Sequence, residues 1–161
     1  MRRTDRRMST EFAWATFDKC NYMTISVVDE NNEPYMIPVL AARVDNHIYY
    51  HSFIHGRMME IMKRSPKVCI SAVHVASVIP LSNDLAFASC IGFGQAHIVD
   101  DPDEIIFGMR LICEKVAKDN IGRFESKIPF SMPHLGMIRI DIDRMTGKAN
   151  LPGISQDGRD E

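Results

Sequence analysis

Six segments of this 161-residue chain have the alternation and the β-branched content of strands, and short polar turns join most of them. The clearest is MIRIDIDRM, in which apolar and polar residues alternate strictly. A strand with one face in a core and the other outside produces this pattern. The predicted strands are Tyr22–Val28, Tyr35–Val44, His47–Phe53, Lys67–Ala76, Ala86–Val99 and Met137–Met145.

Two of these segments have further features that bear on the fold. Tyr35–Val44 is too continuously apolar for a half-exposed strand, which predicts a central strand with both faces covered. The two-residue turn Asp45-Asn46 then returns the chain antiparallel. Ala86–Val99 contains Gly92 and Gly94, which predicts a bulge or a bend inside this strand.

Three short helices are predicted beside the strands. Ser9 is a favoured N-cap for a helix that reaches about Lys19. Gly56 ends a strand and opens a second helix, which Ser65-Pro66 terminates. A third helix runs from Pro102 to about Lys118, behind the acidic cap Asp100-Asp101. Together the elements predict a mainly β fold, an antiparallel sheet closing on itself with two to three flanking helices.

Composition excludes several classes of protein. The length fits one domain, and a net charge of −2 argues against a dedicated nucleic-acid binder. No stretch of 18 apolar residues exists, so no membrane span is expected. The absence of GxGxxG and of βαβα alternation disfavours a doubly wound dinucleotide fold. The cysteines form no CxxC pair and fit a reducing cytoplasm; they are Cys20, Cys69, Cys90 and Cys113.

Two groups of residues are candidate chemical sites. His47, His51 and His55 are four residues apart, but on a strand this spacing separates them by about 13 Å. A metal–nitrogen bond is about 2.1 Å, so no metal site is predicted. Gly56-Arg57 stands at the start of a helix, where free N–H groups and a guanidinium attract phosphate. A solvated arginine at a helix start is the ordinary alternative.

An ordered set of motifs resembles the pyridoxamine-phosphate-oxidase-like split barrels that bind FMN, especially the 5-nitroimidazole resistance and flavin-nucleotide-binding proteins. These typically show PYxxPV, IYFHSA, GRK and NPxVxF in that order. The chain has PYMIPV, IYYHSF, GRM and SPKVCIS. SCIGFGQA resembles the family's SVxxxGxA, MIRIDIDRMTGKA its closing strand with TGK, and MRRTDR its beginning. The resemblance covers about residues 1–149, expected to form one FMN-binding domain before a flexible tail, 150–161.

The resemblance implies a six-stranded split β-barrel and a homodimer with FMN at the interface, so that each site borrows from both chains. By position, His51 would lie near the site and donate a proton or orient a substrate. Met58 departs from the family's usual lysine, which removes a charge-assisted contact worth about 1.5–3 kcal/mol. The implied cofactor-binding residues are Ile37, Pro38, Val39, Leu40, His51, Ser52, Gly56, Arg57, Met58 and Ser89.

The function implied by the resemblance is that of an FMN-dependent oxidoreductase acting on a small molecule, with nitroimidazole-type reduction as one candidate reaction. In such an enzyme the flavin carries the hydride, and the protein supplies binding and electrostatics. Two alternatives stay open: a flavin-nucleotide-binding protein without turnover, and a relative that uses haem or a deazaflavin. Residues 119–134 are expected to contribute to the pocket.

Overall fold

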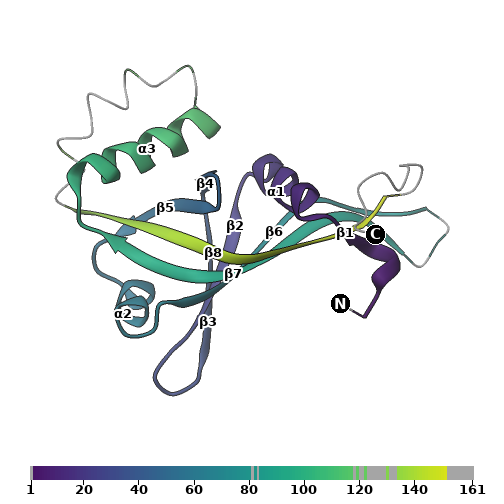
Figure 1. The fold of residues 1–161 in the computed structure, drawn as a ribbon, viewed down its shortest axis with the longest axis horizontal. Helices are drawn as coiled ribbons and strands as arrows, with labels where there is room; N and C mark the ends of the chain where they lie inside the picture. Colours follow the sequence, from purple (N-terminus) through teal and green to yellow (C-terminus); the bar gives the residue numbers. More distant parts are fainter. Residues whose placement is uncertain are drawn as a thin grey trace.

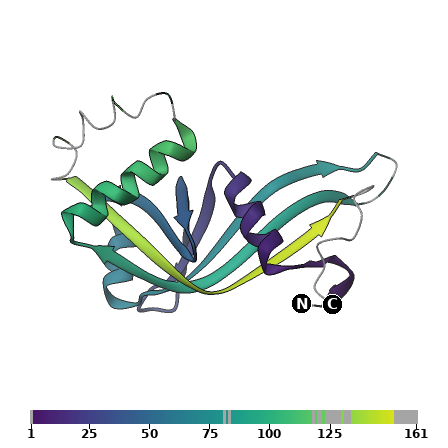
Figure 2. The same ribbon diagram turned by 45° about the horizontal axis from the view of Figure 1, so that its top comes forward.

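The computed structural model describes residues 2–80, 82, 84–117, 119, 122, 130 and 134–151. It shows one antiparallel sheet in the order β3-β2-β6-β7-β8-β5-β4, with β1 paired to β8. The sheet curves without closing, as Figures 1 and 2 show, which confirms the predicted mainly β split barrel with flanking helices. The strands are β1 (Arg7–Met8), β2 (Met23–Val28), β3 (Pro34–Val39), β4 (Ala41–Val44), β5 (His47–Phe53), β6 (Lys67–Val78), β7 (Leu85–Val99) and β8 (Leu135–Asn150).

Three α-helices lie against this sheet, close to their predicted positions. Ser9 caps the first helix by accepting a hydrogen bond from Phe12 N at 3.1 Å, and Asp101 caps the third in the same way. Among the described residues, no helix combines the length and the apolar character that crossing a bilayer requires. The helices are α1 (Thr10–Lys19), α2 (Arg57–Arg64) and α3 (Pro102–Val116), and a short 3-10 turn, η1 (Thr4–Arg6), precedes β1.

The prediction of one central strand over Tyr35–Val44 is wrong. The segment breaks at Leu40 into β3 and β4, which lie at opposite edges of the sheet. The strand with both faces covered is β5, because its successive residues Tyr49 and Tyr50 enter two different hydrophobic clusters. The continuous apolar run therefore marks the point where the chain passes from one edge of the sheet to the other. This division and the additional short strand β1 give eight strands, where six were predicted.

Two hydrophobic clusters lie on opposite faces of the sheet. The main core joins α1 and α2 to the inner face of the strands, with Phe17, Tyr50 and Ile70 almost fully buried. The second cluster lies beneath α3, where Ile112 and Met137 are buried against Tyr49. Figure 1 shows α3 over the end of the sheet that contains β5, and α1 over β7 and β8 nearer the C-terminal end of β8. We call the face of the sheet opposite the main core the outer face. The second cluster covers only the end of this face beneath α3 and does not reach its middle.

The predicted irregularity in the long strand is confirmed. The register between β7 and β8 shifts after Phe93, which pairs with Arg144, so that Gly94 pairs with Ile142. A Cβ on Gly94 would lie 2.1 Å from the carbonyl oxygen of Asp141. A side chain at this position would collide with backbone, and glycine is what permits the two strands to approach.

Candidate functional site

The N-terminus of α2 presents backbone donors that no side chain caps. Gly56 is its N-cap residue and makes no side-chain cap hydrogen bond, in contrast to Ser9 of α1 and Asp101 of α3. The first helical bond runs from Glu60 N to the Gly56 carbonyl oxygen, at 3.1 Å. The N–H groups of the first turn precede that bond and have no helical acceptor, so this end of the helix suits an anion.

Arg57 begins this helix and is held by the turn between β2 and β3. Its Nη2 donates to Asp29 Oδ2 at 3.2 Å and to Glu33 Oε2 at 3.0 Å. The guanidinium also lies over the Tyr35 ring, 4.7 Å from its centroid. The hydrogen bond to Asp29 is the largest cause that raises the pKa of Arg57, and Glu33 acts in the same direction. The cation is therefore fixed in direction while half of its side chain stays exposed.

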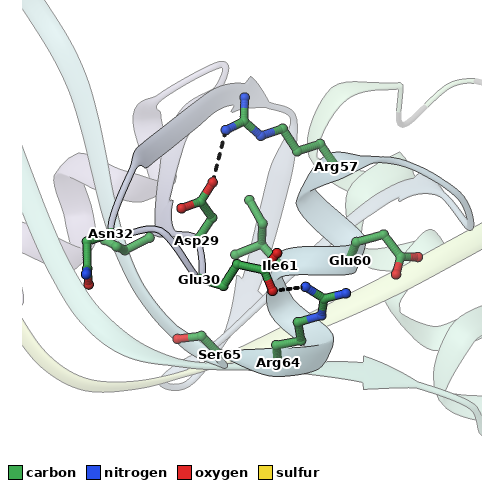
Figure 3. Close-up of a pocket in the computed structure, with 9 residues that line it drawn as sticks. Asp29, Glu30, Asn32, Arg57, Glu60, Ile61, Arg64 and Ser65 are labelled. Atoms are coloured by element: carbon green, nitrogen blue, oxygen red, sulfur yellow. Dashed lines mark hydrogen bonds and ion pairs between the residues drawn. The ribbon is translucent and has the colours of Figure 1, made fainter.

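A cavity of about 510 Å³ opens between this turn and α2 (Figure 3). Two ion pairs cross it, Arg57 with Asp29 and Arg64 with Glu30. Of the site residues predicted from the sequence, only Arg57 lines this cavity. The cavity is therefore mixed in charge, and it lies beside the predicted phosphate site.

Ser52 and Met58 flank the α2 N-terminus differently. Ser52 is half-buried and lies on the same face of β5 as Tyr50, whose hydroxyl contacts Met62 of α2. Ser52 therefore faces the helix. The Met58 side chain is only 4% exposed and belongs to the main core. Any contact of Met58 with a phosphate would come from its backbone N–H.

The predicted flavin strand, β3, is an edge strand in this chain. The side chains of Ile37 and Val39 pack against the main core, and Leu40 packs against the second cluster. Pro38 points to the opposite, exposed face because successive residues of a strand alternate. An edge strand offers unpaired backbone groups, which suits the backbone contacts that the resemblance implies for these residues.

His51 lies where β5 has a free edge, because β4 pairs with β5 only as far as Tyr50. His51 is opposite Met137 of β8, and it faces the side of the sheet away from Ser52. Surrounding protein lowers the pKa of His51 by desolvation, although part of the imidazole is open to solvent. Neutral imidazole offers one donor and one acceptor.

Ser89 lies far from this group within one chain. It pairs with Lys148 of β8, whereas His51 pairs with Met137 of the same strand. Those two β8 residues are eleven positions apart, which is roughly 35 Å along a strand. The sequence-predicted residues therefore fall into a group around β5, α2 and β3, and a separate position at Ser89.

Sequence reasoning missed two sets of charged contacts. The turn Asp29–Glu33 is one of the short polar turns expected between strands, and its acidic residues are the sequence signal that indicates a partner for Arg57. The second set lies on the outer face, where Asp141 accepts from Arg139 at 2.8 Å and contacts His47 at 2.6 Å. Among the described residues, no group of three or more His, Cys, Asp or Glu side chains is arranged to hold a metal ion.

Comparisons with known proteins agree with the fold described above. A family model described as pyridoxamine 5'-phosphate oxidase matches residues 9–149. No curated protein matches the chain. Three solved structures with a similar fold are each 17% or less identical to this chain, which establishes the fold alone.

The first is a proposed 5-nitroimidazole antibiotic resistance protein from Bacteroides thetaiotaomicron, with 17% identity, 87% of this chain and 83% of that chain covered, and a TM-score of 0.73. An FAD- and haem-binding protein from Mycobacterium smegmatis has 13% identity, coverage of 93% and 76%, and a TM-score of 0.76. An FAD-binding protein from Mesorhizobium loti has 17% identity, coverage of 90% and 97%, and a TM-score of 0.61.

Proposed function

The chain belongs to the pyridoxamine 5'-phosphate oxidase family, and on this premise we propose that it is an FMN-dependent oxidoreductase acting on a small molecule. The family supports a flavin-associated oxidoreductase function in general terms. The observation that carries the narrower proposal is the uncapped N-terminus of α2 with Arg57 beside it. Free N–H groups at a helix start beside a guanidinium suit one phosphate group, which is what a flavin mononucleotide has.

The donor set of the chain fits FMN. The first-turn N–H groups of α2 and the Arg57 guanidinium would bind the phosphate, with the Ser52 hydroxyl facing the same helix. The edge strand β3 would offer backbone groups of residues 37–40 to the polar rim of the ring. When bound, FMN supplies hydride transfer at N5 of its ring. Because some structural neighbours are FAD-binding proteins, the experiment must distinguish bound FMN from bound FAD.

His51 is the proposed catalytic side chain. Its lowered pKa keeps the imidazole neutral at neutral pH, so that it can donate one hydrogen bond to a substrate and accept another. Its place at the free edge of β5 keeps it accessible. The fold shared with the proposed nitroimidazole resistance protein makes a nitro-aromatic compound the first substrate to try.

We also propose a cytoplasmic homodimer that forms through the middle of the outer face. The strand register places two rows of neighbouring residues on this face. One row contains Met36, Ser26, Cys69 and Phe93, and the other contains Ser71 and Ile91. Met36 is 63% exposed and Phe93 39% exposed. Apolar side chains gathered on one sheet face are typical of an interaction surface. The four cysteines are free thiols, which fits a reducing compartment.

The test begins with an absorbance spectrum of the purified protein and mass spectrometry of the ligand that it releases. Flavin bands with FMN as the released ligand support the proposal, whereas FAD, a deazaflavin or a Soret band redirects it. Bleaching by NAD(P)H, followed by reoxidation in air, supports turnover. A flavin that no reductant bleaches favours a binding protein without an activity of its own.

Arg57→Ala tests the phosphate contact. The variant loses a charge-assisted contact with the phosphate, so FMN affinity should fall by roughly ten-fold. Quenching of flavin fluorescence on titration measures the affinity. Arg64→Ala is the matched control, because Arg64 lies on the same helix and also pairs with a carboxylate of the β2–β3 turn. Equal affinity in both variants would contradict the assignment of the phosphate to Arg57.

A further inference from the structure

Both carboxylates that hold Arg57 bind the same nitrogen. Asp29 Oδ2 and Glu33 Oε2 each accept from Nη2, at 3.2 and 3.0 Å. Among the described residues, no acceptor is found for Nε or Nη1. A guanidinium binds an oxyanion at two points through one of two edges, either Nε with Nη2 or Nη1 with Nη2. Both edges include Nη2. A two-point contact with a phosphate therefore requires one of these carboxylates to leave.

Asp29 is the better anchored of the two. Its side chain is 13% exposed, and its Oδ1 accepts from the backbone N–H groups of Asn31 and Glu33, both at 2.9 Å. Glu33 is 64% exposed, and its one side-chain hydrogen bond among the described residues goes to Arg57. Glu33 also has the longer and more flexible side chain, so its release disturbs less structure.

Resting on the proposed function, we propose that Glu33 is a displaceable counter-ion for Arg57. The flavin phosphate takes the Nη2 position that Glu33 occupies, while Asp29 and the Tyr35 ring keep the guanidinium in place. Glu33 is thereby a specificity-determining residue, since only a ligand with a charged phosphate competes for the cation. A flavin without phosphate has no group to make this exchange.

The proposal is tested by titrating FMN and riboflavin into wild type and Glu33→Gln, with flavin fluorescence as the readout. Glutamine keeps the length of the side chain but removes the charge that the phosphate must displace. An exposed ion pair is weak, so FMN should bind only about three-fold more tightly to the variant. Riboflavin should bind both proteins equally. Glu33→Ala, which also removes the contact, should show at least the same gain for FMN.

Glu30→Gln is the matched control. Glu30 lies in the same turn, is 63% exposed and pairs with Arg64 instead of Arg57. The proposal is overturned if Glu33→Gln leaves FMN affinity unchanged, if riboflavin gains equally, or if Glu30→Gln gives the same gain. If wild type binds FMN and any of these three contradicting results is obtained, the proposed function stands and only the role of Glu33 fails. If none of the proteins takes up a flavin, the proposed function fails and this role fails with it.

Discussion

At the scale of single residues, Met58 is the position where family pattern and structure diverge most. A lysine here would add a cation for the phosphate, as the resemblance implies, but the Met58 side chain is buried in the main core. An ammonium placed among the apolar side chains of this core loses its hydration. The absent lysine therefore does not leave an open contact in this chain, because the helix N-terminus and Arg57 remain outside the core.

We expect Met58→Lys to lower the free energy of unfolding by several kcal/mol without strengthening FMN binding. Met58→Leu, which nearly conserves volume and adds no charge, should cost less than about 1.5 kcal/mol. Urea denaturation of the three proteins measures the difference. A lysine variant as stable as wild type, with tighter FMN binding, would show that this side chain reaches the phosphate after all.

His51 is expected to make stability depend on pH. Its pKa in the folded protein lies below the ordinary value of 6.5, because desolvation disfavours the imidazolium. The unfolded chain therefore binds the proton more readily, and the free energy of unfolding falls as the pH drops below about 6.5 towards the folded-state pKa. Above that range this contribution is fully present.

The measurement is the urea midpoint at pH 7.5 and at pH 5 for wild type and His51→Gln. Glutamine does not titrate, so the variant should lose less stability on acidification, while all other groups contribute equally to both proteins. An identical loss in the two proteins would show that the folded and unfolded states bind the His51 proton equally.

At the scale of secondary-structure elements, the helices were the most predictable part. Ser9 and Asp101 cap their helices through local hydrogen bonds, so neighbouring residues contain the information that defines each start. The prediction of one strand over Tyr35–Val44 failed because the break at Leu40 depends on which strands pair with each half. In the site, Gly56-Arg57 was predictable from local chemistry, whereas the pairing of Arg57 with Asp29 joins residues 28 positions apart.

The β7–β8 pair depends on a glycine whose replacement has a defined cost. A Cβ on Gly94 would meet the backbone of Asp141, which cannot move alone, whereas a Cβ on Gly92 would meet the Ile70 side chain at 2.9 Å. Gly94→Ala should therefore destabilise by about 3 kcal/mol or more, and Gly92→Ala by less, since a side chain can rearrange. Thermal and urea unfolding compare the two; equal losses would contradict this view of the bulge.

At the scale of the whole molecule, one chain separates the residues that the family pattern assigns to one cofactor. His51 and Ser89 lie roughly 35 Å apart along β8, farther than a flavin ring extends. Both assignments hold together only if Ser89 reaches the site of a second chain. The exposed apolar side chains near Ser89 on the outer face, including Ile91 and Phe93, fit such a contact. The sequence could propose a shared site, and the strand register adds that His51 and Ser89 lie at distant positions along β8 within one chain.

Complementation between two defective chains tests this arrangement. Arg57→Ala removes the phosphate contact, and Ser89→Trp fills the position proposed to face the flavin of the other chain. If each site takes Arg57 from one chain and Ser89 from the other, a mixed dimer keeps one intact site. Random pairing after co-expression makes half of the dimers mixed, so flavin content should reach about a quarter of the wild-type value, while each variant alone binds little. If both residues served the same chain's site, every site in the mixture would be defective and the content would stay at the level of the separate variants.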